Sequence, residues 1–352
     1  MKISKKKAVP LLVLALALCF IFENSLYAET SSDKAADRII NLEPNSGEDF
    51  EWKINEDFTE ITITKYKGTR KDVVIPATIQ DVPVVCIGKD AFYGNNSVIS
   101  VIIPEGVKKI ERYAFCRTKL KSVTLPADIC LEEKAFYDCS ALKTVILGEN
   151  SIIGENAFRN CYSLQSIEIP KGCTLKSSVF TMELSWNSKL ETVTLPEGLV
   201  IIPDYFFFGC RKLANINFPS TLKYIGYNAF YDCALTSVNL PEGLEYIEAG
   251  AFDANTITSV SLPKSLKWIE CNGSMTIIRG NNINTITIAE GCSPKVINSE
   301  ECMDGRDIIK GASIDNSVKL QKQLAEWKLT SAQKQDVNAL YEDLLSYGIG
   351  DE

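Results

Sequence analysis

The chain repeats a unit of about 22 residues, in which apolar positions recur with the same spacing along most of its length. Each unit contains an apolar triplet at positions i, i+3 and i+5, and most units also contain a phenylalanine preceded by a small or apolar residue, most often alanine. The phenylalanines of successive units are Phe92, Phe115, Phe136, Phe158, Phe180, Phe207, Phe230 and Phe252. A repeat of this length predicts a solenoid, whose extended surface usually carries the function.

One unit shows how the pattern predicts local structure. Ile216 and Phe218 alternate with polar residues, which predicts a short strand with one buried face. The proline that follows ends the strand because it cannot donate a ladder hydrogen bond. Two more apolar residues, Leu222 and Ile225, precede the Ala-Phe turn that leads to the next strand. A single unit buries too little apolar surface to stand alone, so we expect the units of residues 73–292 to stack.

Two units depart from this pattern. One contains extra residues that include Leu184 and Trp186, and a second insertion lies around Asn272. In the second unit, Thr276 and Ile277 stand where Ala-Phe is expected. Insertions in solenoids form loops on one face, and such a loop can be either a binding element or a tolerated bulge.

Residues 29–72 are expected to form a polar linker followed by a cap on the first coil. The apolar residues Phe50, Trp52 and Ile54 alternate with polar ones, as do Ile61 and Ile63. This pattern predicts a β-hairpin. A hairpin here would cover the core and the sheet edge that an open solenoid end exposes.

Residues 293–352 are expected to form a degenerate repeat end and a helical hairpin. Leu320, Leu324 and Trp327 fit one amphipathic helix. The apolar face of a second helix would consist of Val337, Leu340, Tyr341, Leu344 and Leu345. This segment would either cover the last coil or dock another protein.

The N-terminus has the pattern of an export signal over residues 1–28. Three lysines, Lys5 to Lys7, precede the short apolar run 8–22 and a polar stretch that ends at Ala28. Acylation of Cys19 would instead make the protein a lipoprotein, but Leu18 is larger than the residue that normally precedes a lipidated cysteine. We expect an exported protein located at the cell surface, secreted or in the periplasm. No later segment has the length and apolarity of a membrane span.

Composition excludes several kinds of chemistry. The chain has no histidine, which removes Ser-His-Asp and Cys-His catalysis and the HExxH zinc site. Its net charge of −8 disfavours a nucleic-acid partner. Neither a CxxC pair nor a calcium-binding or phosphate-binding motif occurs, so we expect no metal and no cofactor.

Four cysteines occupy one position of the repeat, three residues after the phenylalanine. They are Cys139, Cys161, Cys210 and Cys233. This regularity favours buried, reduced thiols that act as small apolar side chains. Disulfides between neighbouring coils remain an alternative, because adjacent coils lie about 5 Å apart.

The pattern Leu-x-x-Val-x-Leu-Pro-x-x-Leu-x-x-Ile-x-x-x-Ala-Phe-x-x-Cys resembles the BspA-like, treponemal-type leucine-rich repeats, and residues 213–233 show it well. The resemblance covers 73–292. It implies an α/β repeat solenoid, a right-handed leucine-rich-repeat coil with one parallel β-sheet face. Similar proteins are typically bacterial surface proteins, and some are linked to attachment to host matrix or to other bacteria. The resemblance thus implies a binding scaffold and names no ligand.

The outward positions of the expected strands are mostly small, neutral hydrogen-bonding residues. We consider the following a candidate partner-binding face: Ile102, Thr124, Thr144, Ile146, Ser166, Glu168, Thr192 and Thr194, with Leu184 and Trp186 in the insertion. Paired carboxylates or an activated nucleophile do not occur on this face, so we expect no enzyme. Cross-strand pairing of serine and threonine on an exposed sheet is the alternative interpretation of the same residues.

The sequence therefore predicts an exported protein that binds a protein partner. That partner would be an extracellular-matrix or bacterial surface protein, and the role would be adhesion. The alternative is a non-adhesive structural scaffold of the cell envelope.

Overall fold

The computed structural model describes residues 43–182, 188–271, 277–290, 292 and 295–298. The chain divides into two compact units, Met1–Glu43 and Pro44–Glu352, and the described residues belong to the second unit except for Glu43. The expected export signal, most of the expected linker and the expected C-terminal helical hairpin lie outside the described residues. Within the described part, the helical content is one short 3-10 turn, η1 (Gly47–Asp49).

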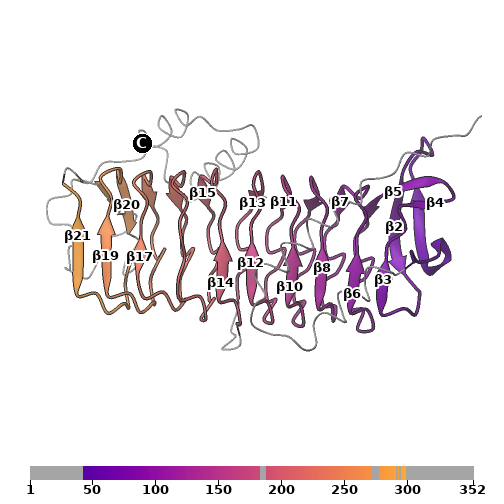
Figure 1. The fold of residues 1–352 in the computed structure, drawn as a ribbon, viewed down its shortest axis with the longest axis horizontal. Coiled ribbons are helices and arrows are strands. Elements are labelled where there is room, and N and C mark those ends of the chain that lie inside the picture. The colour runs from indigo at the N-terminus through magenta and orange to yellow at the C-terminus, as the bar shows by residue number, and fades with distance from the viewer. Residues whose placement is uncertain (1–42, 183–187, 272–276, 291, 293–294, 299–352) are drawn as a thin grey trace, which may run out of the picture. The chain divides into compact units, whose positions relative to one another are not determined.

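The predicted parallel sheet is present, and it is built from the strands that end near the repeat prolines (Figure 1). It consists of three ladders along one side of the coils. The first contains β3 (Asp72–Val74), β6 (Ser100–Ile102), β8 (Ser122–Thr124) and β10 (Thr144–Ile146), the second β12 (Ser166–Glu168) and β14 (Thr192–Thr194), and the third β17 (Val238–Asn239), β19 (Ser259–Leu262) and β21 (Thr285–Ile288). The middle residues Val101, Val123 and Val145 face one another in register and are buried. We call this the first sheet.

A second parallel sheet runs along the other side of each coil, so the expectation of one sheet face was wrong. It consists of two ladders. The first contains β5 (Val82–Ile87), β7 (Lys109–Ile110), β9 (Cys130–Leu131), β11 (Ile152–Ile153) and β13 (Thr174–Leu175), and the second contains β15 (Ile201–Ile202), β16 (Tyr224–Ile225), β18 (Tyr246–Ile247), β20 (Trp268–Cys271) and β22 (Lys295–Asn298). Most of these strands have two residues, so the sequence offers no alternation that would reveal them. The described coils therefore form a β-solenoid and not the expected α/β repeat.

The predicted N-terminal hairpin is present. Strand β1 (Phe50–Ile54) pairs antiparallel with β2 (Ile61–Tyr66), and β2 pairs parallel with β5. A short strand, β4 (Thr78–Ile79), also pairs with β5. In the hairpin turn, the side-chain oxygen of Asn55 accepts hydrogen bonds from the backbone N–H groups of Thr59 and Glu60, at 2.8 and 3.0 Å. The hairpin thus extends the second sheet at its first edge.

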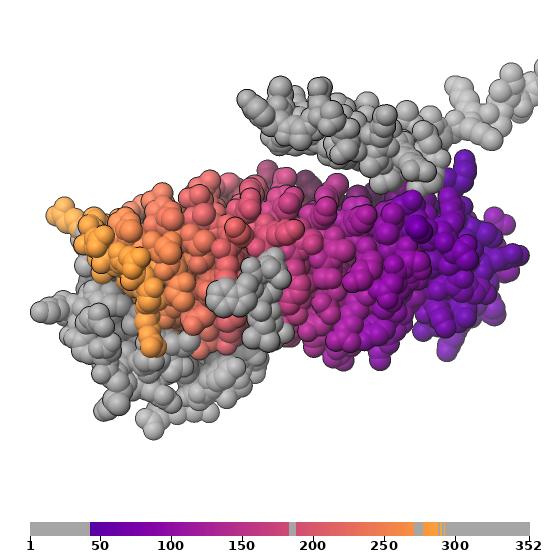
Figure 2. Space-filling model, turned by 90° about the horizontal axis from the view of Figure 1, so that it is seen from below, coloured from indigo at the N-terminus to yellow at the C-terminus, as the bar shows by residue number. Residues whose placement is uncertain are grey.

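The Ala-Phe turns build the core between the two sheets. The rings of successive phenylalanines from Phe92 to Phe252 lie 4.6 to 5.7 Å apart, and most are stacked. The backbone N–H of each phenylalanine donates to the turn of the next coil, as Phe136 does to the carbonyl of Ala157 at 2.9 Å. Successive coils therefore lie side by side in chain order, as the colour sequence of Figure 2 shows.

Two residues with left-handed backbone flank most of these turns. Around Phe230 they are Asn228 and Asp232, with φ of 52° and 55°.

The structure also corrects the alignment of one turn. The backbone N–H of Phe252 donates to the carbonyl of Ile277, in the next coil, at 2.9 Å. Ile277 and Ile278 therefore replace the Ala-Phe pair, and the sequence alignment that assigned this role to Thr276 and Ile277 was wrong by one residue.

The cysteines of the repeat act as buried hydrogen-bonding side chains. The Cys161 thiol donates to the carbonyl of Phe136 at 3.4 Å, and burial raises the pKa of the Cys139 thiol to about 12. In later coils an asparagine takes the same role, since the amide of Asn255 donates to the carbonyl of Phe230 at 2.8 Å. The cysteine side chains that the structure describes are free thiols. Coil-to-coil disulfides are thus not formed among them.

Candidate functional site

The outward side chains of the first sheet form two columns along the solenoid. Parallel register places Ser100, Ser122 and Thr144 in one column, and Ile102, Thr124 and Ile146 in the other. After β10 the columns continue as Ser166 with Thr192, and as Glu168 with Thr194. The structure therefore places on one outer face all the candidate residues of the strands. Seven of the eight are exposed, and Ile102 is half-buried.

The hydroxyl groups of this face are largely unused within the described residues. At the first edge, Ser100 Oγ donates to Asp72 Oδ1 at 2.6 Å. Thr124, Thr144, Ser166, Thr192 and Thr194 form no side-chain hydrogen bond to any described residue. The interpretation in which these residues pair across the strands therefore has no support beyond Ser100. Their donors and acceptors face water and are available to a partner.

The candidate residues fall into two groups, because the ladder of the first sheet is interrupted between β10 and β12. In the coil of β10, Gly148 replaces the usual proline. A Cβ atom on Gly148 would lie 2.3 Å from the carbonyl carbon of Pro126, so the backbone here packs directly against the preceding coil. We call the outer face of β6, β8 and β10 the N-terminal plate, and that of β12 and β14 the second plate.

A row of lysines borders the N-terminal plate, and the sequence analysis did not identify it. Lys71, Lys121 and Lys143 precede β3, β8 and β10, and all three are exposed. The second plate carries negative charge instead, from Glu168 and Glu191. None of these five side chains forms an ion pair with a described residue. The recurrence of lysine directly before the strand in three units was the signal that could have revealed the row.

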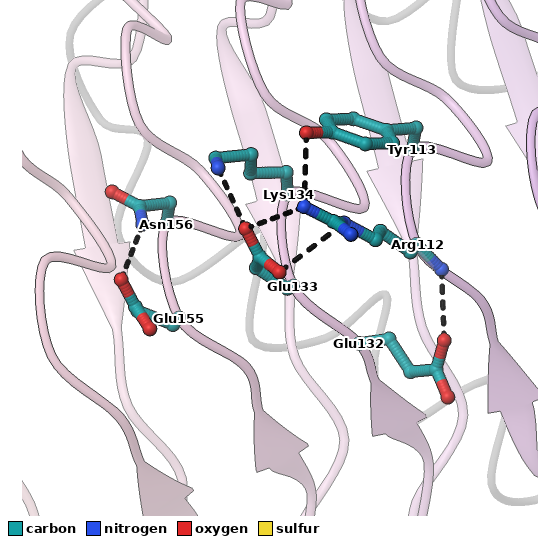
Figure 3. A network of polar contacts seen from close by, with 7 residues as sticks. All are labelled: Arg112, Tyr113, Glu132, Glu133, Lys134, Glu155 and Asn156. Atoms are coloured by element: carbon teal, nitrogen blue, oxygen red, sulfur yellow. Dashed lines mark hydrogen bonds and ion pairs between the residues drawn. The ribbon is translucent and has the colours of Figure 1, made fainter.

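Glu132 and Glu133, on the second sheet, pair with basic side chains of their own and the preceding coil (Figure 3). Glu132 accepts from the backbone N–H of Arg112 at 3.0 Å. It also pairs with Lys109 at 2.5 Å. Glu133 pairs with Lys134 at 2.6 Å and with Arg112 at 3.2 Å. Partial burial opposes ionisation of Glu132, but these contacts hold its pKa below the usual value. The hydrogen bond from Lys134 likewise lowers the pKa of Glu133. An acid–base pair needs one carboxyl group with a raised pKa, so this network joins coils and does not form a catalytic pair.

One cavity of about 730 Å³ lies at the N-terminal end of the solenoid. Its lining includes Phe50 and Trp52 of β1, Ile79 of β4, and the oppositely charged Glu48 and Lys67. Of the hydroxyl groups in the lining, that of Ser46 accepts a hydrogen bond from the backbone N–H of Glu48 at 3.2 Å. Across the described residues, no cluster of acidic and cysteine side chains could hold a metal ion.

Leu184 and Trp186, the candidate residues of the insertion, lie outside the described residues, so the structure does not place them. The residue before the insertion still pairs with the next coil, since the backbone N–H of Met182 donates to the carbonyl of Phe208 at 2.8 Å.

Among the described residues, no helix has the length and apolarity needed to cross a bilayer.

Comparison with known proteins identifies the repeat. The model of the BspA-type leucine-rich repeat region, in six copies, matches residues 60–187 and 183–299. A leucine-rich repeat protein of T. pallidum is 28% identical, with a TM-score of 0.49, over 54% of this chain and 89% of its own. A leucine-rich cell surface protein of Faecalibacterium prausnitzii is 24% identical, with a TM-score of 0.47, over 75% of this chain and 86% of its own. The pneumococcal vaccine antigen PcpA is 18% identical, with a TM-score of 0.36, over 81% of this chain and 96% of its own.

No curated protein matches the chain at a significant level. The match to the repeat family extends over more than half of the chain and includes every coil of both sheets. Proteins with such repeats commonly bind other proteins and are generally not enzymes. The chain therefore belongs to the BspA-type leucine-rich repeat proteins.

Proposed function

We propose that this chain is an exported surface protein that binds a protein partner through the N-terminal plate of the first sheet, in adhesion to host matrix or to other cells. One observation carries the proposal: this plate combines apolar side chains with hydroxyls and a border of lysines that have no partner among the described residues. Ile146 is 38% exposed, whereas the residues of the same strands that face inward are buried. The export pattern of residues 1–28 supports the location.

The plate would recognise a partner as a rigid, preformed surface. Ile102 and Ile146 flank Thr124 in register, so two strand spacings, about 10 Å, separate them. A partner with two apolar side chains at this spacing would cover both isoleucines and reach the hydroxyl of Thr124 between them, with the hydroxyl of Thr144 in the neighbouring column. The strands are fixed by hydrogen bonds and by the core, so little conformational entropy would be lost on binding. The lysine border would favour an acidic partner surface.

A matched pair of substitutions tests this proposal. Ile146→Asp adds a charge to the plate, and Ile152→Asp adds the same charge to the outer face of the second sheet, where Ile152 is 42% exposed. Binding of the mature chain to immobilised collagen, laminin and fibronectin, and to whole bacterial cells, would be measured for both variants. We expect Ile146→Asp to weaken binding at least about tenfold, which is about 1.4 kcal/mol, and Ile152→Asp to have no effect.

Equal binding by the two folded variants would show that the N-terminal plate is not the binding site. Circular dichroism of each variant supplies the control for folding. Stronger loss with Ile152→Asp would move the site to the second sheet. Absence of binding to every probe would leave the envelope scaffold as the better explanation of the fold.

A further inference from the structure

The two edges of the N-terminal plate carry opposite charges. Just before the strands begin, four lysines are exposed: Lys71, Lys119, Lys121 and Lys143. Just after the strands end, the exposed charged residues are acidic: Glu105, Asp128 and Glu149. We call the first group the basic edge and the second group the acidic edge. The first-sheet strands run upward in Figure 1, so Figure 2, seen from below, shows the side of the coils on which they begin.

Backbone hydrogen bonds hold the basic edge in line. The N–H of Ile99 donates to the carbonyl of Lys71, and the N–H of Lys121 donates to the carbonyl of Ile99, both at 2.8 Å. The next link, from the N–H of Lys143 to the carbonyl of Lys121, is also 2.8 Å long. These residues therefore occupy one position in successive coils. Lys121 and Lys143 are one coil spacing apart, about 5 Å, and Lys71 lies two spacings from Lys121, about 10 Å.

The ammonium groups of the basic edge form no ion pair and no hydrogen bond with a described residue. Other cations of the same coils are paired: Lys109 lies 2.5 Å from Glu132, and Arg117 lies 3.4 Å from Asp138. Like charges that are held in neighbouring coils repel each other. An anionic ligand along the basic edge would remove this repulsion.

The acidic edge does not cancel this charge. Strand β10 alone, which separates Lys143 from the acidic edge, spans about 10 Å. Charges that are exposed to water are largely screened beyond the Debye length, which is about 8 Å at physiological ionic strength. The basic edge is therefore a local positive surface on a chain whose net charge is −8.

The arrangement of the four lysines suits a linear polymer with closely spaced anionic groups. The lysines follow the solenoid axis, and none of them lines the cavity at the N-terminal end. Lys119, Lys121 and Lys143 place three ammonium groups on two neighbouring coils. A polysaccharide that carries sulfate as well as carboxylate groups has the charge density to meet them. Lysine binds such groups as a compact point charge, without the planar geometry that arginine requires.

The side chains beside the basic edge favour a sugar over a nucleic-acid base. The outward residues that follow the lysines are Ser122, Thr124 and Thr144. Their hydroxyls can both donate to and accept from the hydroxyls of a sugar. Proteins that bind single-stranded nucleic acid stack the bases on aromatic side chains, and the outward positions of β6, β8 and β10 contain no aromatic residue.

We propose that the basic edge binds a sulfated polysaccharide, which lies along the solenoid axis across the coils of β3 to β10. Its sulfate groups pair with the lysines, and its hydroxyls contact Ser122 and Thr144. The acidic edge repels the polymer and so confines it to one side of the plate. This ligand goes beyond the protein partner of the proposed function, and its binding does not depend on that partner.

Binding of the mature chain to heparin, measured at low, physiological and high salt, tests the proposal. We expect the affinity to fall steeply as salt rises. The double variant Lys121→Gln with Lys143→Gln removes two charges from the basic edge and should weaken binding at least about tenfold at physiological salt. Lys121→Arg with Lys143→Arg keeps both charges and should retain most of the affinity.

The matched control is Lys171→Gln with Lys264→Gln. Both lysines are exposed, and each directly follows the proline after a first-sheet strand, β12 or β19. The control therefore removes the same charge from the opposite edge, and it should leave heparin binding unchanged. Circular dichroism checks the fold of every variant. Equal losses in the two Lys→Gln variants would overturn the proposal, because net charge alone would then explain binding.

Three other polymers identify the ligand chemistry. Desulfated heparin, poly-glutamate and single-stranded DNA should each bind clearly more weakly than heparin. Absence of heparin binding would overturn the proposal, and so would equal or tighter binding of any of the three.

Ile146→Asp separates this proposal from the proposed function. Ile146 ends β10 and lies about 10 Å from Lys143, so the variant should lose matrix proteins and keep heparin. Heparin binding by a chain that binds no matrix protein would contradict the proposed function alone. Binding of matrix proteins by a chain that does not bind heparin would contradict this inference alone.

Discussion

Removal of one ring from the phenylalanine stack should destabilise the solenoid strongly at its centre. Phe136 is fully buried, and its ring lies 5.0 Å from that of Phe115 and 5.2 Å from that of Phe158. Phe136→Ala removes the buried ring and leaves a cavity, which costs about 3–5 kcal/mol in protein cores. Each lost ring contact contributes about 0.5–1.5 kcal/mol of this loss. We therefore expect the free energy of unfolding to fall by about 4 kcal/mol.

The location of Phe136 adds a second expectation. Each coil packs only on its neighbours, so a weak central interface should separate the unfolding of the two ends. Urea unfolding followed by far-UV circular dichroism would measure the free energy, and amide hydrogen exchange would report each end. We expect exchange to accelerate most in the coils next to Phe136.

Phe58→Ala is the control for this measurement. Phe58 lies in the hairpin turn and is 72% exposed, so its loss should change stability by less than about 0.5 kcal/mol. A cost below about 1 kcal/mol for Phe136→Ala would refute the reasoning, as would equal effects of the two substitutions.

Two other predictions concern buried polar groups. Asn255 donates to the carbonyls of Phe230 and Phe252 at 2.8 and 2.9 Å, so Asn255→Ala should destabilise the chain by about 2–4 kcal/mol. Asn255→Cys restores the residue found in earlier coils and should lose clearly less in the same urea titration. Glu270 has a pKa of about 7 in the folded chain against 4.5 in the unfolded chain, so the folded state binds the additional proton between these pH values. Stability should therefore fall by up to about 3 kcal/mol as the pH rises from 4.5 to 7, and Glu270→Gln should flatten this dependence. A pH profile that Glu270→Gln leaves unchanged would show that another group is responsible.

The sequence revealed the first sheet because its strands alternate apolar and polar residues over several positions. It also revealed the hairpin at Phe50 and the burial of Cys161 in a shared repeat position. The second sheet was not predicted, because a two-residue strand such as β7, which contains Ile110, is too short to show an alternation of apolar and polar residues. The break after β10 could not be predicted either, because strand pairing is a property of two neighbouring coils and not of one unit.

The sequence was sufficient to predict which residues lie on the candidate face. Register and exposure of Thr124, Ile146 and Glu168 follow from their place beside the buried middle residue of each strand. Their use in binding stays a prediction. The burial of Tyr224 and Tyr246 could not be predicted, because their strands have only two residues and show no alternation that would distinguish buried from exposed positions.

Protease accessibility of the mature protein on intact and on permeabilised producing cells tests the central claim most directly. A protein that binds partners at the cell surface should be digested on intact cells, with cleavage at exposed loops. Protection on intact cells that is lost on permeabilisation would place the solenoid inside the envelope. That result would contradict adhesion and favour the structural scaffold.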